Sequence, residues 1–203
     1  MAVTPHYWEE AKIYLSGNDR VMGGIISSYG GETLQKKYDP FITLARSITG
    51  QQISVKAADS VWNKLEKNLG KITAKNILKC EEDLLRASGY SKQKVSYLKN
   101  IAENFANGNI SAELLADMDE ETAIKELVKL KGVGRWTAEM FLIFHMMKPD
   151  VFPIADLGLQ KAIKLHYSTE KDGMLKLAEK WRPYCTVATW YLWRSLDPVP
   201  VQY

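Results

Sequence analysis

The sequence has only two cysteines, Cys80 and Cys185, and they form no C-x-x-C pair. A zinc site built mainly from thiolates is therefore not expected, and one chain cannot supply the four cysteines of an iron–sulfur cluster. We expect both to be free, buried thiols. The three histidines, His6, His145 and His166, show no metal-ligand spacing, and His145, inside an apolar run, is expected to be a core residue.

Long hydrophobic runs are also missing, since no stretch approaches the roughly 20 apolar residues of a membrane helix. The first residues carry charges and aromatics where a secretory signal needs an apolar run. The net charge is only +3, which permits a polyanionic partner without requiring one. With 46% hydrophobic and 25% charged residues, the chain has the composition of an ordinary folded protein. We expect it in the cytoplasm, or in the nucleus of a nucleated cell.

What the sequence does have is helical periodicity along almost its whole length. The predicted helices span residues 54–70, 91–108, 119–130, 136–147, 156–166, 171–181 and 183–196. The short runs 151–154 and 199–201 are interrupted by proline, so strand signals are weak. We predict an all-α protein of roughly ten short helices.

Two helix boundaries carry specific expectations. Asp119 is a candidate N-cap for the helix over 119–130, in which Ile124, Leu127 and Val128 are expected to face inward. Pro183 suits a helix start, where its missing N–H costs nothing.

The most informative local feature is the turn Gly132-Val133-Gly134 between two amphipathic stretches. Glycine can take positive φ and has no side chain, so the turn can be tight, with its backbone N–H groups facing outward. These groups lie at a helix N-terminus, which favours an anion. Val133 is expected to anchor the turn in the core, while Lys131 and Arg135 add positive charge. The turn is suited to hold a phosphate, although an ordinary αα-hairpin with a capping glycine has the same pattern.

Four further segments appear in order with this turn: Ile48–Ser54, Gly89–Lys94, Pro153–Gly158 and a stretch from Trp181–Tyr184 to Trp190–Trp193. Together the motifs resemble the helix-hairpin-helix (HhH-GPD) DNA glycosylase superfamily, and within it the DNA-3-methyladenine glycosylase II branch. The match runs from about residue 40 to residue 196 and so covers most of the chain.

The resemblance implies a bilobed helical fold in which residues 1–203 form one domain of two lobes, with the hairpin at about 119–147. The N-terminal β-lobe of larger bacterial relatives is not expected, because the helical pattern begins almost at once. The implied function is a monofunctional glycosylase that hydrolyses the N-glycosidic bond of alkylated purines in duplex DNA and leaves an abasic site, in base excision repair. We expect it to act as a monomer, on DNA and not on membranes.

The resemblance also assigns roles to residues. Asp156 is implied as the catalytic carboxylate, Trp136, Trp193 and Met140 as base-pocket residues, and Gln52 as the wedge that fills the gap left by an everted nucleotide. The implied DNA contacts are Gln51, Gln52, Ser91, Lys92, Lys131, Gly132, Gly134, Arg135 and Thr137. The carbonyls of Val128, Leu130 and Val133 match positions that can hold Na⁺ or K⁺, and no other cofactor is implied.

The residue types fit this chemistry. Cleaving an N-glycosidic bond places positive charge on the sugar, which the Asp156 carboxylate would stabilise, although Asp156 could also be simply a helix N-cap. Strand cleavage needs an amine to form a Schiff base, and Trp136 stands where strand-cleaving relatives have lysine. Its electron-rich indole would instead attract a cationic methylated purine. Lys92 and Lys94 could hold flanking backbone or simply be solvated.

Two alternatives stay open from the sequence. One is a non-catalytic helix-hairpin-helix module that binds DNA without sequence preference. The other is a glycosylase that removes oxidised or mismatched bases and nicks the strand.

Overall fold

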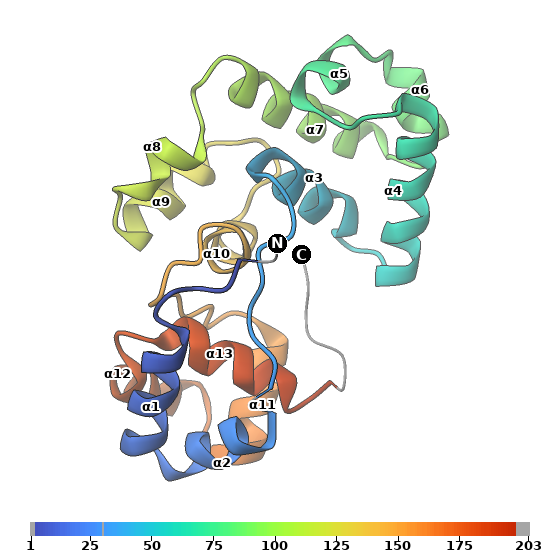
Figure 1. Cartoon of the computed structure of the whole chain (residues 1–203). Helices are drawn as coiled ribbons and strands as arrows, with labels where there is room; N and C mark the ends of the chain where they lie inside the picture. Colours follow the sequence, from blue (N-terminus) through green and yellow to red (C-terminus); the bar gives the residue numbers. More distant parts are fainter. Residues whose placement is uncertain (1–2, 30, 198–203) are drawn as a thin grey trace. The chain divides into compact units, whose positions relative to one another are not determined.

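The computed structural model describes residues 3–29 and 31–197, which contain 13 α-helices and a single isolated β-bridge between Val3 and Lys36. The all-helical prediction is confirmed. The described residues divide into two compact units (Figure 1): the first comprises those within 3–37 and 142–197, and the second Tyr38–Phe141. Among the described residues, no helix has the length and apolar character needed to cross a membrane.

The first unit is organised around its last helix. Its helices are α1 (Trp8–Asn18), α2 (Arg20–Tyr29), α11 (Leu157–Tyr167), α12 (Lys171–Trp181) and α13 (Cys185–Arg194). α13 packs against the other four, and all ten of its residues are buried. An apolar helix of this kind has no solvent-facing side and forms the centre of a core.

Asp19 ties three helices of this unit together. Its Oδ1 accepts hydrogen bonds from the backbone N–H groups of Val21 and Met22 at the start of α2, at 2.9 and 3.0 Å. Its Oδ2 accepts from the hydroxyl of Tyr167 on α11 at 2.9 Å and from the indole of Trp181 on α12 at 3.0 Å. Burial alone would raise the pKa of Asp19, but these hydrogen bonds lower it overall.

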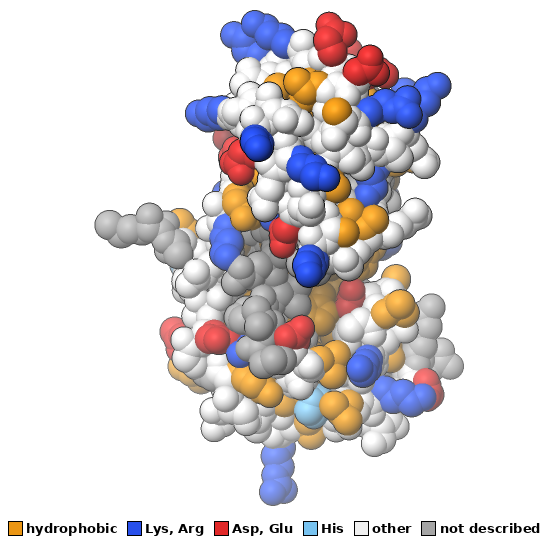
Figure 2. Space-filling model, turned by 90° about the vertical axis from the view of Figure 1, so that its right-hand side faces the viewer, with side chains coloured by type: hydrophobic (Ala, Val, Ile, Leu, Met, Phe, Trp, Pro, Cys, Tyr) orange, Lys and Arg blue, Asp and Glu red, His pale blue; other side chains and the backbone are white. Residues whose placement is uncertain are grey.

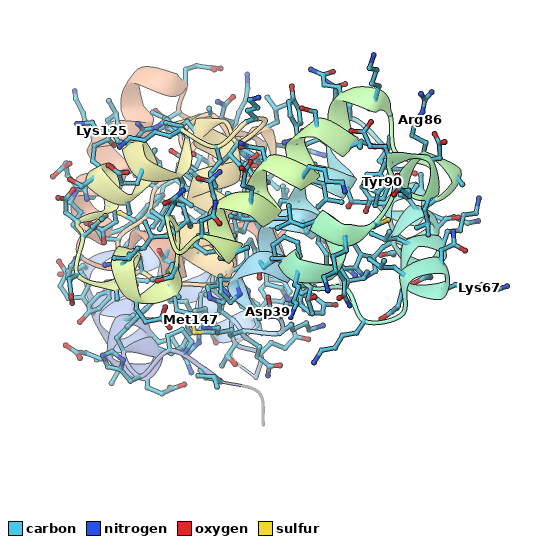
Figure 3. All side chains as sticks on the ribbon, turned by 90° about the horizontal axis from the view of Figure 1, so that it is seen from above. Asp39, Lys67, Arg86, Tyr90, Lys125 and Met147 are labelled. Atoms are coloured by element: carbon cyan, nitrogen blue, oxygen red, sulfur yellow. The ribbon has the colours of Figure 1, made fainter. Side chains whose placement is uncertain are left out.

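The second unit is built around α7. Its helices are α3 (Pro40–Gly50), α4 (Val55–Leu69), α5 (Ala74–Lys79), α6 (Glu82–Ala87), α7 (Lys92–Ala106), α8 (Ala112–Ala116) and α9 (Glu120–Leu127), and α10 (Arg135–Phe144) begins in this unit and ends in the first. α7 packs against α3, α5 and α6. Tyr90, just before α7, is buried among these helices (Figure 3), and its hydroxyl lies 2.7 Å from that of Thr49. Burial raises the pKa of Tyr90 to about 12.

The structure corrects several expectations. There are 13 helices in the described residues, not about ten, because α5, α6 and α8 have only five or six residues and are too short to show a helical period. Val128 is 39% exposed instead of facing inward. α9 ends at Leu127, and after that Leu130 and Val133, each 4% exposed, take the interior positions.

Two helix ends are also corrected. The helix predicted over 136–147 ends at Phe144, before Met147, which has a positive φ of 52°. Pro183 does not start a helix: it follows a cis peptide bond in the turn that precedes α13, which begins at Cys185. Cys80 and Cys185 are free and buried as predicted, and the run 199–201 lies outside the described residues.

Candidate active site and nucleic-acid interface

Asp156, the predicted catalytic residue, is the N-cap of α11 in the first unit. Its Oδ1 accepts a hydrogen bond from the backbone N–H of Leu159 at 2.7 Å, so the capping interpretation is correct. The same oxygen accepts a second hydrogen bond from the indole Nε1 of Trp193, at 2.8 Å. The ring of Trp193 stacks on Phe144, with centroids 5.8 Å apart and planes 10° from parallel. The carboxylate is thus held in one orientation by a helix end and a packed indole.

Gly158 makes room for this arrangement. A Cβ atom at position 158 would lie 3.1 Å from Oδ1 of Asp156 and 3.4 and 3.5 Å from Cδ1 and Nε1 of Trp193. The absence of a side chain therefore lets the indole and the carboxylate approach each other. Gly158 is not among the site residues predicted from the sequence, although it ends the segment Pro153–Gly158 on which the family resemblance rests.

Trp193 makes a contact that was not predicted from the sequence. As a base-pocket aromatic it would need an open face, but it is 6% exposed and its N–H is used by Asp156. The observed geometry makes Trp193 a residue that orients the carboxylate. Its assignment to the base pocket stays a prediction.

The hairpin lies in the second unit and has two glycines in different situations. Gly132 has a φ of +81°, and a Cβ there would fall 2.2 Å from Cδ2 of the Tyr97 ring, so only glycine fits. Gly134 has no neighbouring atom within 4 Å of an added Cβ, and it is exposed. Val133 between them is 4% exposed and anchors the turn as predicted. Gly132 therefore shapes the turn, while Gly134 gives it an open surface.

The backbone N–H groups of the turn are only partly available. The N–H of Lys131 donates to Oδ1 of Asn100 at 2.8 Å, and that of Val133 donates to the carbonyl of Leu130 at 3.1 Å. The expectation that the N–H groups of the turn face outward is therefore wrong for these two. The Lys131 side chain is exposed as expected.

Arg135 is not a free cation at the surface of the turn. Its guanidinium donates two hydrogen bonds to Glu121, at 2.9 and 2.7 Å, and one to Glu139 at 3.0 Å. The hydrogen bond with Glu121 raises its pKa. Two carboxylates already offset the positive charge that Arg135 would offer to a phosphate.

Two predicted contacts on α10 are buried. Thr137 is 4% and Met140 is 1% exposed. Neither side chain is open to DNA or to a base in this structure, because both face the interior side of an amphipathic helix. Trp136 is partly exposed, so it is more accessible than Met140.

The predicted wedge lies in the turn between α3 and α4. Gln52 is exposed and has a left-handed φ of 59°, which is uncommon for a residue other than glycine. The side-chain amide of its neighbour Gln51 donates to the carbonyl of Gly132 at 2.9 Å. Two elements that the sequence predicted separately, the wedge turn and the hairpin, are therefore bonded to each other.

The residues at the start of α7 that could contact DNA have different surroundings in the structure. The Ser91 hydroxyl caps the helix by accepting from the N–H of Lys94 at 3.2 Å, and Lys92 is exposed. Lys94 does not reach for a phosphate. Its ammonium donates to the carbonyls of Thr49 and Gln51, at 2.8 and 2.7 Å.

Comparison with known proteins decides the family. Residues 45–183 match the model described as HhH-GPD superfamily base excision DNA repair protein. The chain belongs to this superfamily. It is 34% identical over 197 residues to DNA-3-methyladenine glycosylase 1 of Schizosaccharomyces pombe, covering 92% of the chain and 86% of the relative. It is 29% identical to a putative DNA-3-methyladenine glycosylase of Bacillus subtilis, covering 87% of the chain and 66% of the relative.

Solved structures agree. The HhH-GPD fold of this chain resembles that of the S. pombe 3-methyladenine DNA glycosylase in complex with abasic DNA, with a TM-score of 0.78 and 31% identity over 92% of this chain and 96% of that one. It also resembles a DNA-3-methyladenine glycosidase from Bacillus halodurans, with a TM-score of 0.81 and 29% identity over 96% and 92% of the two chains.

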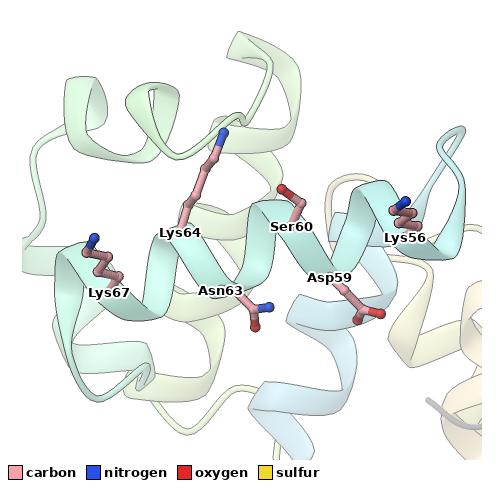
Figure 4. A pocket seen from close by; sticks show the side chains of 6 residues that line it. All are labelled: Lys56, Asp59, Ser60, Asn63, Lys64 and Lys67. Carbon is pink, nitrogen blue, oxygen red and sulfur yellow. The ribbon is translucent and has the colours of Figure 1, made fainter.

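One further depression lies on the surface of this HhH-GPD protein, along the outer face of α4. It has a volume of about 790 Å³ and is lined by Lys56, Asp59, Ser60, Asn63, Lys64 and Lys67, all from one helix (Figure 4). Asp59 forms an ion pair with Arg46. Basic and acidic side chains mingle on this side of the molecule (Figure 2). Without an aromatic wall, this face offers no place for a base.

Proposed function

We propose that this HhH-GPD protein is a DNA glycosylase that removes alkylated purines from duplex DNA by hydrolysing the N-glycosidic bond. The observation that carries the proposal is the Asp156 carboxylate, held by Leu159 and Trp193, in a chain similar over 92% of its length to a DNA-3-methyladenine glycosylase. The product would be an abasic site, as in the first steps of base excision repair.

The proposed chemistry depends on the negative charge of the Asp156 carboxylate. A base inside a duplex is out of reach, so the nucleotide must first leave the base stack, at a cost of about a few kcal/mol. As the bond to the base breaks, positive charge develops on the sugar, and the oriented carboxylate of Asp156 stabilises it or orients the attacking water. A purine methylated at N3 or N7 is already cationic and leaves readily. We assign its recognition to the indole face of Trp136, which attracts a cation by about 0.5–2 kcal/mol.

We propose hydrolysis without strand cleavage. Tryptophan cannot form a Schiff base, and Trp136 occupies the position where strand-cleaving relatives have lysine. Borohydride reduction during turnover is therefore expected to trap no covalent adduct with DNA. A trapped adduct would favour a glycosylase for oxidised or mismatched bases instead.

The remaining parts of the proposal concern how the DNA is held. Gly134, Lys131 and Lys92 are exposed, and we assign them to the phosphate backbone. The carbonyls of Val128, Leu130 and Val133 belong to the end of α9 and the turn that follows it, and carbonyl oxygen suits a hard cation. Bound Na⁺ or K⁺ there would place positive charge beside a phosphate. We propose that the protein acts as a monomer, in the cytoplasm of a prokaryote or the nucleus of a eukaryote.

Replacing Asp156 by asparagine tests the function directly. Asparagine is as good an N-cap as aspartate, so Asp156→Asn keeps the start of α11 and removes only the charge. Release of 3-methyladenine from methylated duplex DNA should fall by about 10²–10³-fold, the loss typical of removing one electrostatic stabiliser. Equal release by the two proteins would refute the catalytic assignment. DNA binding without base release from any damaged duplex would instead favour a non-catalytic DNA-binding module.

A further inference from the structure

The ammonium of Lys94 closes the C-terminal end of α3. α3 ends at Gly50, and the carbonyls of Thr49 and Gln51, which accept from Lys94, lie immediately before Gln52. A cation at a helix C-terminus interacts favourably with the helix dipole and satisfies carbonyls that have no partner within the helix. Burial lowers the pKa of Lys94, as expected for a group withdrawn from water.

The turn that Lys94 holds contains a strained residue. Gln52 has a φ of 59°, and a non-glycine residue keeps this conformation only where its surroundings enforce it. The backbone on one side of Gln52 is fixed by Lys94, and the adjacent Gln51 side chain is fixed by the carbonyl of Gly132. Gly132 is in turn fixed by the Tyr97 ring beneath it, and Tyr97 lies on the same helix as Lys94.

We infer that Lys94 is a positioning residue for nucleotide eversion: with Gln51 it locks the Gln52 turn to the hairpin, so that wedge and phosphate grip act as one rigid surface. The inference rests on the proposed function. It adds a role for Lys94 and Gln51 in which neither residue needs to touch the substrate. Locking matters because a wedge replaces a base in the stack only if it enters at a fixed position relative to the gripped backbone. If the turn were mobile, the stacked bases would displace it, and the nucleotide would stay in the duplex.

The chain offers a matched control on the same helix. Lys99 also donates two hydrogen bonds to carbonyls at a helix end, those of Leu78 at 3.0 Å and Cys80, where α5 finishes. Lys99→Met and Lys94→Met therefore remove the same kind of helix cap from the same unit. Only Lys94→Met frees the wedge turn.

Single-turnover excision should separate the two variants. Lys94→Met should slow release of 3-methyladenine from a fully paired duplex by about tenfold, but by less than about twofold when the lesion faces an abasic position and is already poorly stacked. Lys99→Met should change both rates by less than about twofold. Gln51→Leu, which removes the link to Gly132, should repeat the selective pattern of Lys94→Met. A loss of stability alone would instead affect both duplexes equally.

Eversion can also be followed without excision. The fluorescence of 2-aminopurine at the target position of a duplex increases when that base leaves the stack. This increase on protein binding should be lost with Lys94→Met and kept with Lys99→Met. If wild type excises 3-methyladenine but Lys94→Met behaves like Lys99→Met in both assays, the inference is overturned and the proposed function stands. If wild type unstacks the probe in a Lys94-dependent way without excising, the inference stands and the proposed function fails. A defect in Lys94→Met but not in Gln51→Leu would overturn the link to the hairpin.

Discussion

The same substitution, Gly→Ala, should destabilise the protein at one glycine of the hairpin and leave its stability almost unchanged at the other. At Gly132 the new methyl group would overlap the Tyr97 ring at 2.2–2.7 Å, and alanine would be forced to a φ of +81°. The left-handed conformation costs roughly 1–2 kcal/mol and an overpacked contact roughly 1–3 kcal/mol. Gly132→Ala should therefore destabilise the protein by about 2–5 kcal/mol. Gly134→Ala, which meets no atom within 4 Å, should change stability by less than about 0.5 kcal/mol.

Thermal unfolding of the two variants measures this difference. For a chain of this length the cost at Gly132 corresponds to a fall in Tm on the order of 10 °C. Removing the ring separates the two contributions: in a Tyr97→Ala background only the backbone cost of about 1–2 kcal/mol should remain. The reasoning is refuted if Gly132→Ala unfolds at the wild-type temperature, or if its cost is unchanged when the ring is absent.

A larger side chain at Gly134 tests DNA binding separately from stability. Gly134→Leu should leave Tm near the wild-type value, because the added side chain projects into open space. It should nevertheless weaken affinity for an abasic-site duplex by about tenfold, since the side chain would stand between the turn and a phosphate. Unchanged affinity would mean that the hairpin is only structural.

Two further predictions concern the first unit. Trp193→Phe keeps the stack on Phe144 but removes the donor to Asp156, so excision should slow by about tenfold with unchanged affinity for abasic DNA. Excision at the wild-type rate would contradict this orienting role. Asp19→Asn should destabilise the protein by about 1–2 kcal/mol at pH 7, discounted for partial exposure. Because hydrogen bonds hold the pKa of Asp19 below its unfolded value, its contribution is present above pH ~4 and is lost as pH falls through the folded pKa. Urea unfolding of both proteins from pH 7 to pH 2.5 should show the difference shrink, and a constant difference would contradict the assignment.

The sequence predicted contacts that connect near neighbours along the chain. Asp119 and Asp156 cap their helices as expected, each accepting from an N–H three residues ahead. Such contacts follow from the residue type and the start of a periodic stretch, with no knowledge of the tertiary fold. The glycine turn was predictable for the same reason, and so was the core position of Val133.

The contacts that hold the Gln52 turn connect residues that are far apart in the sequence. No pattern in the sequence indicates these contacts. Gln51 meets Gly132 across 81 positions, and Lys94 meets the end of α3 across more than 40. Nothing in the spacing of these residues says that they meet. Resemblance named Met140 as a pocket residue by position, whereas the packing of α10 buries it. Positional matching transfers a role without naming the neighbours of the residue, so the pocket role of Met140 stays a prediction.

The contacts that matter most are local to one unit each. Asp156 is oriented by Leu159, Trp193 and the space at Gly158, all in the first unit. The wedge turn is held by Lys94 and Gly132, both in the second. Chemistry and strand opening should therefore fail separately: Trp193→Phe should slow excision whether or not the lesion is paired, whereas Lys94→Met should slow it only when pairing must be broken. A protein in which both variants lost activity in the same proportion on paired and unpaired lesions would not have this division of labour.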